Sequence, residues 1–296
     1  MNKTTRLRRL IEQKELLVMP GAYDPLSAKL VERAGFEAIQ CTGLGISGTV
    51  LGKPDYSMLA MSDMALATQR IAESVDIPVM ADGDTGFGNA VNVHYAVQAF
   101  ERAGAAGVNL EDQVMPKRCG HLDGKAVISI EEGITKIRAA AEARRDPDFV
   151  INARTDALAT GGIDEVIRRG NAYLEAGATM IFVEGVDSLP VINAAVQGIR
   201  GPVAVNIVHG GRSSGFDLAD LQAIGVARVS LPGIMLQSAM LAMDAVLRDV
   251  RESGSALGIS ERLYPFRDLH ALLGTDEVSA LEQRYLGPLK ALEESR

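Results

Sequence analysis

Eight short apolar segments recur along this chain, and each has about the length of one buried β-strand. They are apolar throughout, which is typical of strands that are covered on both faces. The segments are Leu16–Met19, Ala38–Thr42, Ile77–Asp82, Gly107–Glu111, Phe149–Ala153, Thr179–Glu184, Val203–Val208 and Ala227–Leu231. Segments with helical periodicity alternate with them: Pro25–Arg33, Ser62–Glu73, Val91–Arg102, Ile130–Arg144, Asp164–Glu175, Leu189–Gly198, Leu218–Ile224 and Met235–Glu252. This alternation predicts a parallel sheet with helices packed outside it.

Three of the helix-to-strand turns share one ending. Gly35, Gly104 and Gly177 each follow an alanine at the end of a predicted helix and precede a predicted strand. Glycine adopts the left-handed conformation that turns a helix end toward the next strand. The N-cap residues expected at helix starts are Ser129, Asp164 and Asp217.

Eight strand–helix units in 296 residues indicate an α/β protein with the (β/α)8 TIM-barrel fold. An open doubly wound sheet would have fewer strands and a glycine-rich phosphate-binding turn after the first one, which Met19–Tyr23 is not. We expect residues 1–296 to form a single barrel domain, with a C-terminal helical extension over about 253–296. The apolar positions of that extension predict packing on a partner subunit; they are Leu272, Leu273, Leu281, Tyr285, Leu286 and Leu289.

The composition excludes several classes of function. The net charge is −8 with no basic block, which argues against binding to nucleic-acid phosphates. Aromatic residues make up only 4% and tryptophan is absent, so a stacking surface for single-stranded nucleic acid is not expected. No segment approaches the roughly 18 apolar residues of a membrane span, and the N-terminus lacks the apolar core of a signal peptide. Two cysteines do not make a disulfide framework. We therefore expect a cytoplasmic enzyme with no nucleic-acid or membrane partner.

Polar side chains gather where the predicted strands end, and in (β/α)8 barrels those carboxyl ends build the active site. The ends carry Thr42, Gly43, Asp82, Asp84, Glu111, Arg154, Glu184 and Asn206. Asp82 and Asp84 flank Gly83, so both carboxylates can face one concavity. Such oxygen ligands suit Mg²⁺, whereas Zn²⁺ is disfavoured because clustered His and Cys ligands are missing. The alternative is that both aspartates cap the helix that starts near Asn89.

The loop after the fourth predicted strand reads Lys117, Arg118, Cys119, Gly120, His121. Cations beside a thiol lower its pKa and make it a usable acid or base, so Cys119 is a catalytic candidate. Cys41, in contrast, lies within an apolar segment and is expected in the core. Gly120 permits tight loop geometry.

Two further features can hold an anion. Arg154 follows an apolar strand and can bind a carboxylate through two hydrogen bonds; the alternative is an ion pair with Asp156 or Glu184. The glycines at 43, 45 and 48 predict a flexible loop whose backbone N–H groups could receive a carboxylate or an oxyanion.

These motifs together resemble the isocitrate lyase/phosphoenolpyruvate mutase superfamily, in consistent order from about Pro20 to Val250. The Lys117–His121 loop resembles its signature, and the segments Asp82–Gly88 and Leu110–Gln113 resemble its metal-site segments. The size and the loop are most similar to 2-methylisocitrate lyase and 2,3-dimethylmalate lyase. The resemblance implies a (β/α)8 barrel, Mg²⁺ (Mn²⁺ as a substitute), and a homo-oligomer, a tetramer built of dimers that exchange a C-terminal helix.

The resemblance also implies roles for individual residues. Asp82, Asp84 and Glu111 would form the metal region, with Asp84 closest to the ion. The substrate would be bound by Thr42, Gly43, Leu44, Asp55, Gly120, Arg154, Glu184 and Asn206. The catalytic set would be Lys117, Cys119, His121, Arg154 and Glu111, with Cys119 as the acid that protonates the product carbanion. The base that takes the hydroxyl proton is left open between a metal-bound water, Glu111 and His121.

The reaction implied is a retro-aldol cleavage of a 2-hydroxy di- or tricarboxylate to pyruvate and a second carboxylate. Phosphonomutases of the superfamily commonly lack the cysteine, so Cys119 favours C–C cleavage. The alternatives on the same pocket are oxaloacetate decarboxylation or hydrolysis and phosphonomutase chemistry. Three segments depart from 2-methylisocitrate lyases, namely Leu122–Asp123, His209–Arg212 and Ser213–Ser214. These departures favour a smaller substrate, such as a substituted malate.

Overall fold

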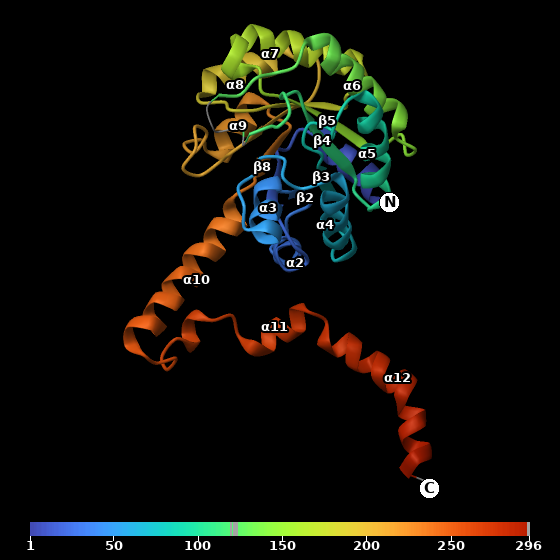
Figure 1. The fold of residues 1–296 in the computed structure, drawn as a ribbon, viewed down its shortest axis with the longest axis vertical. Helices are drawn as coiled ribbons and strands as arrows, with labels where there is room; N and C mark the ends of the chain where they lie inside the picture. The colour runs from blue at the N-terminus through green and yellow to red at the C-terminus, as the bar shows by residue number, and fades with distance from the viewer. Residues whose placement is uncertain (119, 121–123, 295–296) are drawn as a thin grey trace. The chain divides into compact units, whose positions relative to one another are not determined.

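The computed structural model describes residues 1–118, 120 and 124–294, with side chains as far as residue 287. Eight parallel strands pair in sequential order, and the last strand pairs with the first, which closes a barrel (Figure 1). The strands are β1 Leu17–Ala22, β2 Ile39–Cys41, β3 Val79–Asp82, β4 Gly107–Glu111, β5 Val150–Thr155, β6 Met180–Val183, β7 Val203–Asn206 and β8 Arg228–Leu231. The predicted (β/α)8 barrel is confirmed.

The helices after the strands also follow the predicted order. They are α2 Pro25–Arg33, α4 Met61–Glu73, α5 Ala90–Arg102, α6 Ile130–Ala143, α7 Leu158–Glu175, α8 Leu189–Gly198, α9 Leu218–Ile224 and α10 Ile234–Ser253. Gly35, Gly104 and Gly177 adopt φ of +89°, +82° and +108°, so the expected left-handed turns are present. Ser129 and Asp217 cap α6 and α9 as predicted. The cap predicted at Asp164 is wrong, because α7 already starts at Leu158 and bends at Gly162.

Two helices were not predicted. Helix α1, Lys3–Glu12, buries Leu7, Leu10 and Ile11. These side chains pack with Leu17 and Ala106, at the starts of β1 and β4, so α1 closes the N-terminal end of the barrel. Helix α3, Gly43–Leu51, occupies the segment that was expected to be a glycine-rich loop.

The chain divides into two compact units, residues 1–237 and 238–296. The first holds the barrel and its core, and α10 begins in it. The second continues α10 and adds η1 Ser260–Arg262, α11 Phe266–Leu272 and α12 Thr275–Glu294. No side chain described between residues 238 and 287 is buried. Within the described part of the chain, no helix combines the length and the apolar character that crossing a membrane requires.

Candidate active site

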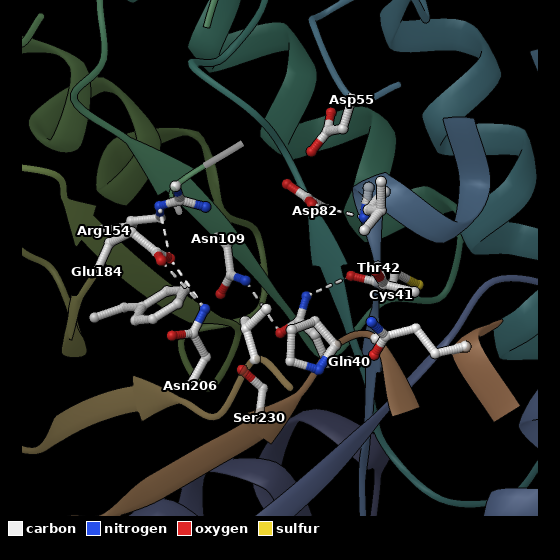
Figure 2. A pocket seen from close by; sticks show the side chains of 18 residues that line it. Gln40, Cys41, Thr42, Asp55, Asp82, Asn109, Arg154, Glu184, Asn206 and Ser230 are labelled. Carbon is white, nitrogen blue, oxygen red and sulfur yellow. Dashed lines mark hydrogen bonds and ion pairs between the residues drawn. The ribbon is translucent and has the colours of Figure 1, made fainter. Parts of the chain in front are cut away.

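One hollow of about 90 Å³ opens at the carboxyl ends of the strands (Figure 2). That space accommodates several waters or one small ligand. Its lining includes Gln40, Cys41, Thr42, Gly43, Leu44, Asp55, Asp82, Asn109, Gly120, Arg154, Phe182, Glu184, Asn206 and Ser230. All eight residues predicted to bind substrate are in this lining, although their role stays a prediction. Every strand from β2 to β8 contributes a residue at or near its end.

The first wall is the start of α3. Thr42 is the N-cap of this helix, and its side chain accepts a hydrogen bond from the Gly45 N–H. The Gly43 N–H donates to Asp82 Oδ2 at 3.0 Å. A Cβ atom at Gly43 would lie 2.6 Å from that oxygen, so only glycine lets the helix approach the carboxylate this closely. The segment thus offers backbone N–H groups as predicted, but from a helix N-terminus, where the helix dipole also favours anions.

A buried lysine lies among the acids of the next strands. Lys117 Nζ is 2.6 Å from Asp55 Oδ1 and 2.9 Å from Asp84 Oδ1. Burial alone would lower the pKa of Lys117, but Glu111, Asp84 and Asp55 raise it well above its usual range. This lysine therefore stays protonated and holds the two aspartates in place.

The predicted metal residues do not all face the hollow. Asp82 lines it, whereas Asp84 and Glu111 are not part of its lining and pair with Lys117 and Arg154. Burial raises the pKa of Asp84 to about 7, although Lys117 opposes the shift. Burial also raises the pKa of Glu111 well above its usual range, against the effect of Arg154. The described residues include no three His, Cys, Asp or Glu side chains arranged to hold a metal ion.

The donor chemistry nevertheless fits Mg²⁺. Glu111 Oε1 is buried and accepts no hydrogen bond from a described residue, so one carboxylate oxygen is left for another ligand. Mg²⁺ is commonly held by one or two carboxylates and several waters, which needs no preformed cage of three side chains. The Asp82–Asp84 turn does not cap the helix near Asn89, because Asn89 caps α5 with its own side chain.

Arg154, at the end of β5, is surrounded by carboxylates. Its Nε lies 2.9 Å from Asp156 Oδ2 and 3.4 Å from Glu184 Oε2, and its Nη1 lies 3.1 Å from Glu111 Oε2. Burial alone would lower the pKa of Arg154, but these three acids raise it well above its usual range. The ion pairs considered as the alternative from the sequence are therefore present, and they hold the guanidinium at the edge of the hollow.

The wall opposite α3 is formed by Glu184 and the loop at Gly120. Asn206 Nδ2 donates to both carboxylate oxygens of Glu184, at 3.3 and 3.2 Å (Figure 2). A Cβ atom at Gly120 would lie 2.4 Å from Glu184 Cδ, so the loop passes directly against this carboxylate. Lys125 Nζ donates to Gly120 O and lies 2.8 Å from Asp156 Oδ1, which ties the loop to the end of β5.

Several residues at the candidate site have no signal in the sequence. Lys125 is one lysine among many in the chain, and only the folded loop shows that it holds Gly120 and Asp156 together. Phe182, Asn109 and Gln40 lie within apolar strands of the sequence, yet all three line the hollow. The predicted catalytic residues Cys119 and His121 lie outside the described residues, as do Leu122 and Asp123.

Comparison with known proteins places this chain among enzymes of one family. The family model for phosphoenolpyruvate phosphomutase matches residues 7–251. A 2,3-dimethylmalate lyase from Eubacterium barkeri is 40% identical over 285 residues, which cover 96% of this chain and 99% of the relative. A 2-methylisocitrate lyase from Aeropyrum pernix is 40% identical over 268 residues, 90% of this chain and 86% of the relative. A solved structure of phosphonopyruvate hydrolase, complexed with oxalate and Mg²⁺, has a TM-score of 0.88 and 35% identity, and covers 97% of this chain and 100% of the other.

Proposed function

We propose a substrate for this chain, which belongs to the phosphoenolpyruvate phosphomutase family and is a carbon–carbon lyase. It cleaves a 2-hydroxy dicarboxylate of the substituted-malate type. The products would be pyruvate and a second carboxylate. The observation that carries the proposal is the arrangement of Arg154, the α3 N-terminus and Asp82 around one small hollow. The similarity to 2,3-dimethylmalate lyase over almost the whole of both chains supports the same substrate class.

The walls of the hollow suit the hydroxyl-bearing end of such a substrate. The α3 N-terminus and Arg154 can receive a carboxylate and the neighbouring oxygen of the hydroxyl-bearing carbon. Mg²⁺, held in the region of Asp82, Asp84 and Glu111, would stabilise negative charge on that oxygen when bound. The similar phosphonopyruvate hydrolase, whose structure holds Mg²⁺ and oxalate, supports this cofactor.

Cleavage then requires two proton movements. The substrate's tertiary hydroxyl loses its proton, the C2–C3 bond breaks, and its electron pair stays on the departing carboxylate fragment. The hydroxyl carbon becomes the keto carbon of pyruvate. Cys119 donates a proton to the carbanion, so that 2,3-dimethylmalate would give pyruvate and propionate. Lys125 supports this step by holding the Gly120 carbonyl, next to the thiol in the chain.

The test is pyruvate release from 2,3-dimethylmalate and from 2-methylisocitrate, each with Mg²⁺ and with excess chelator. We expect Mg²⁺-dependent pyruvate, faster from the dimethylmalate. Comparable rates on both substrates would remove the preference for a substituted malate. Absence of pyruvate from both would overturn the lyase proposal.

A second candidate is hydrolysis of the P–C bond in phosphonopyruvate, because the similar structure is a phosphonopyruvate hydrolase. Hydrolysis of the P–C bond also leaves a carbanion, the enolate of pyruvate, that takes up a proton. The products therefore separate the two candidates: phosphonopyruvate would give inorganic phosphate and pyruvate, and a substituted malate would give pyruvate and a second carboxylate. A Cys119→Ala variant should lose lyase turnover by a factor of about 10² to 10⁴. Full turnover of the best substrate by this variant would instead favour phosphonomutase chemistry, a rearrangement that takes up no proton.

We also propose that the chain forms a homo-oligomer through its C-terminal helices, by exchange between subunits. The support is that residues 238–287 contain no described buried side chain, while large apolar residues there are exposed. Those with more than half of their surface exposed include Met240, Leu241, Met243, Leu247, Leu257, Phe266, Val278 and Tyr285. Apolar surface of this extent marks an interaction site.

A further inference from the structure

The barrel interior contains a buried arginine without an ion-pair partner among the described residues. Arg228, in β8, has none of its surface exposed. Its Nη2 donates to Gln40 Oε1, its Nε approaches Met19 Sδ at 3.3 Å, and its Nη1 has no hydrogen-bond partner in the described part of the chain. The interior of this fold is usually filled with branched apolar side chains, so an arginine here is unusual.

Burying the charge of Arg228 is unfavourable for the free energy of folding. An ion taken out of water without a counter-charge loses several kcal/mol of solvation, so removing it usually does not destabilise a protein. Burial lowers the pKa of Arg228 to about 9, which still leaves the side chain charged at neutral pH. Unpaired buried charges of this kind concentrate at functional sites.

Arg228 lies directly beneath the pocket floor, which we define as Gln40, Asn109, Phe182 and Ser230. All four line the hollow. Figure 2 shows Gln40, Asn109 and Ser230 there. Gln40 Oε1 accepts hydrogen bonds from Arg228 and, at 3.0 Å, from Asn109. The Arg228 guanidinium lies 5.6 Å from the centroid of the Phe182 ring, and Arg154 lies 5.5 Å from the same centroid. One layer of side chains therefore separates this charge from a ligand.

The other buried cations of the site already have counter-charges. Arg154 is paired with three carboxylates, Lys117 with two, and Lys125 with Asp156. Their charges are therefore largely cancelled before a ligand arrives. No described carboxylate lies within ion-pair distance of Arg228, although Asp82, which lines the hollow, raises its pKa against the effect of burial. The charge of Arg228 is therefore only partly balanced, and it acts on whatever occupies the hollow.

We propose that Arg228 is a specificity-determining residue, whose charge beneath the pocket floor makes the hollow prefer a dianion to a monoanion of the same shape. The inference rests on the proposed function in one respect, that the substrate binds in this hollow. It deepens that function by assigning the ligand class: a compact dicarboxylate whose second negative charge lies toward the barrel interior.

The test compares oxalate with oxamate, which has nearly the same shape but one negative charge fewer. Their Kd values are measured by calorimetry on the full-length protein at a fixed Mg²⁺ concentration, for the wild type and for Arg228→Met. We expect the variant to bind oxalate about tenfold more weakly and oxamate nearly unchanged. Equal weakening of both ligands, or no weakening of either, would overturn the proposal.

Thermal unfolding separates this role from a structural one. Arg228→Met should keep or raise the Tm, because it replaces an unpaired buried charge with an apolar side chain. Arg169→Met is the matched control: Arg169 is also buried but pairs with Asp112 and Glu165, so its loss should lower the Tm by several degrees and leave the oxalate preference intact. If Arg228→Met does not fold, Arg228→Gln, which is neutral but can still donate to Gln40, undergoes the same comparison.

Failure of this inference and failure of the lyase proposal give different results. Ligand binding needs no turnover, so a chain that shows the charge preference but releases no pyruvate retains the inference and loses the lyase function. A chain that releases pyruvate while Arg228→Met leaves the oxalate-to-oxamate ratio unchanged retains the lyase function and loses the inference.

Discussion

Asp84 illustrates how burial sets the chemistry of a single carboxyl group in this site. Its pKa is raised to about 7 by burial, although Lys117 lies 2.9 Å away. A proton therefore competes with a metal ion for this carboxyl at pH values below about 7, because only the ionised form is a good ligand. We expect Mg²⁺ to bind the metal-free protein several-fold more tightly at pH 8 than at pH 6, as measured by calorimetry.

The control for this prediction is Asp84→Asn, which cannot ionise. The variant should bind Mg²⁺ weakly at both pH values, with much of the pH dependence removed. Equal Mg²⁺ affinity of the wild type at pH 6 and pH 8 would contradict the assignment of Asp84 to the metal region.

Asp112 stabilises the fold behind the site. This buried carboxylate accepts hydrogen bonds from Thr155 Oγ1 at 2.8 Å, the Asp156 N–H at 2.9 Å, Tyr173 OH at 3.0 Å and Arg169 Nη1 at 3.1 Å. Removing one partner of a buried ion pair typically costs about 3–5 kcal/mol. Asp112→Asn should lower the free energy of unfolding by about that amount in denaturant titrations.

The matched control for Asp112 is an exposed ion pair. Arg200 and Glu175 lie 2.5 Å apart with most of both side chains in solvent. Glu175→Gln should cost less than about 1 kcal/mol, because water screens exposed pairs. A similar loss in both variants would mean that the Asp112 network contributes no more than a surface pair.

At the residue scale, the sequence revealed the candidate site in part. Arg154 and the acids were recognisable because they follow apolar strands, whose carboxyl ends meet at one rim of a barrel. Lys125 and Arg228 were not recognisable, since their meaning depends on contacts with residues far along the chain, Asp156 and Gln40. Spacing in the sequence carries no record of such contacts.

At the scale of elements, α3 offers a direct test of how the site is built. Gly43→Ala would bring a methyl group to 2.6 Å from Asp82 Oδ2 and 3.4 Å from Asp55 Oδ2. We expect this variant to fold but to lose at least about tenfold in kcat/KM, because the helix start must shift away from the acids. Steady-state kinetics and circular dichroism would check both points.

Gly48→Ala is the matched control in the same helix. A Cβ atom there would meet only Leu236 Cδ2, at 3.9 Å. Since alanine favours the helix interior over glycine by roughly 0.5–1 kcal/mol, this variant should keep its activity and gain slightly in stability. A loss of activity equal to that of Gly43→Ala would show that the effect comes from the helix as a whole.

The barrel elements were predictable because their signals are local: apolar strands, helical periodicity and glycine at the turns. Helix α3 was missed because its three glycines, Gly43, Gly45 and Gly48, have low helix propensity and suggest a loop. It forms nevertheless, with Thr42 as its cap and with Gly43 required for the close approach to Asp82. Tertiary contacts here override local propensity.

For the whole molecule, the exposed apolar residues after Ser238 predict self-association. Leu281, Tyr285 and Leu286 in α12 are 43%, 63% and 44% exposed. We expect light scattering to give the mass of an oligomer, with a tetramer as the expected form. Replacing these three residues with serine should reduce that mass, while Glu277→Ser and Arg284→Ser in the same helix should not. A monomer in the wild type would contradict the prediction.

The pairing of β1 with β8 has a consequence for how the protein is made. Because the register joins Leu17 to Arg228 and Pro20 to Leu231, the first strand has no permanent neighbour on one side until the last strand has been synthesised. During translation, closure waits for Leu231 to leave the ribosome, and residues 238–296 are still being added behind it. The segment that follows β8 lies between the closing strands and the ribosome at that moment, so the barrel can close before translation ends.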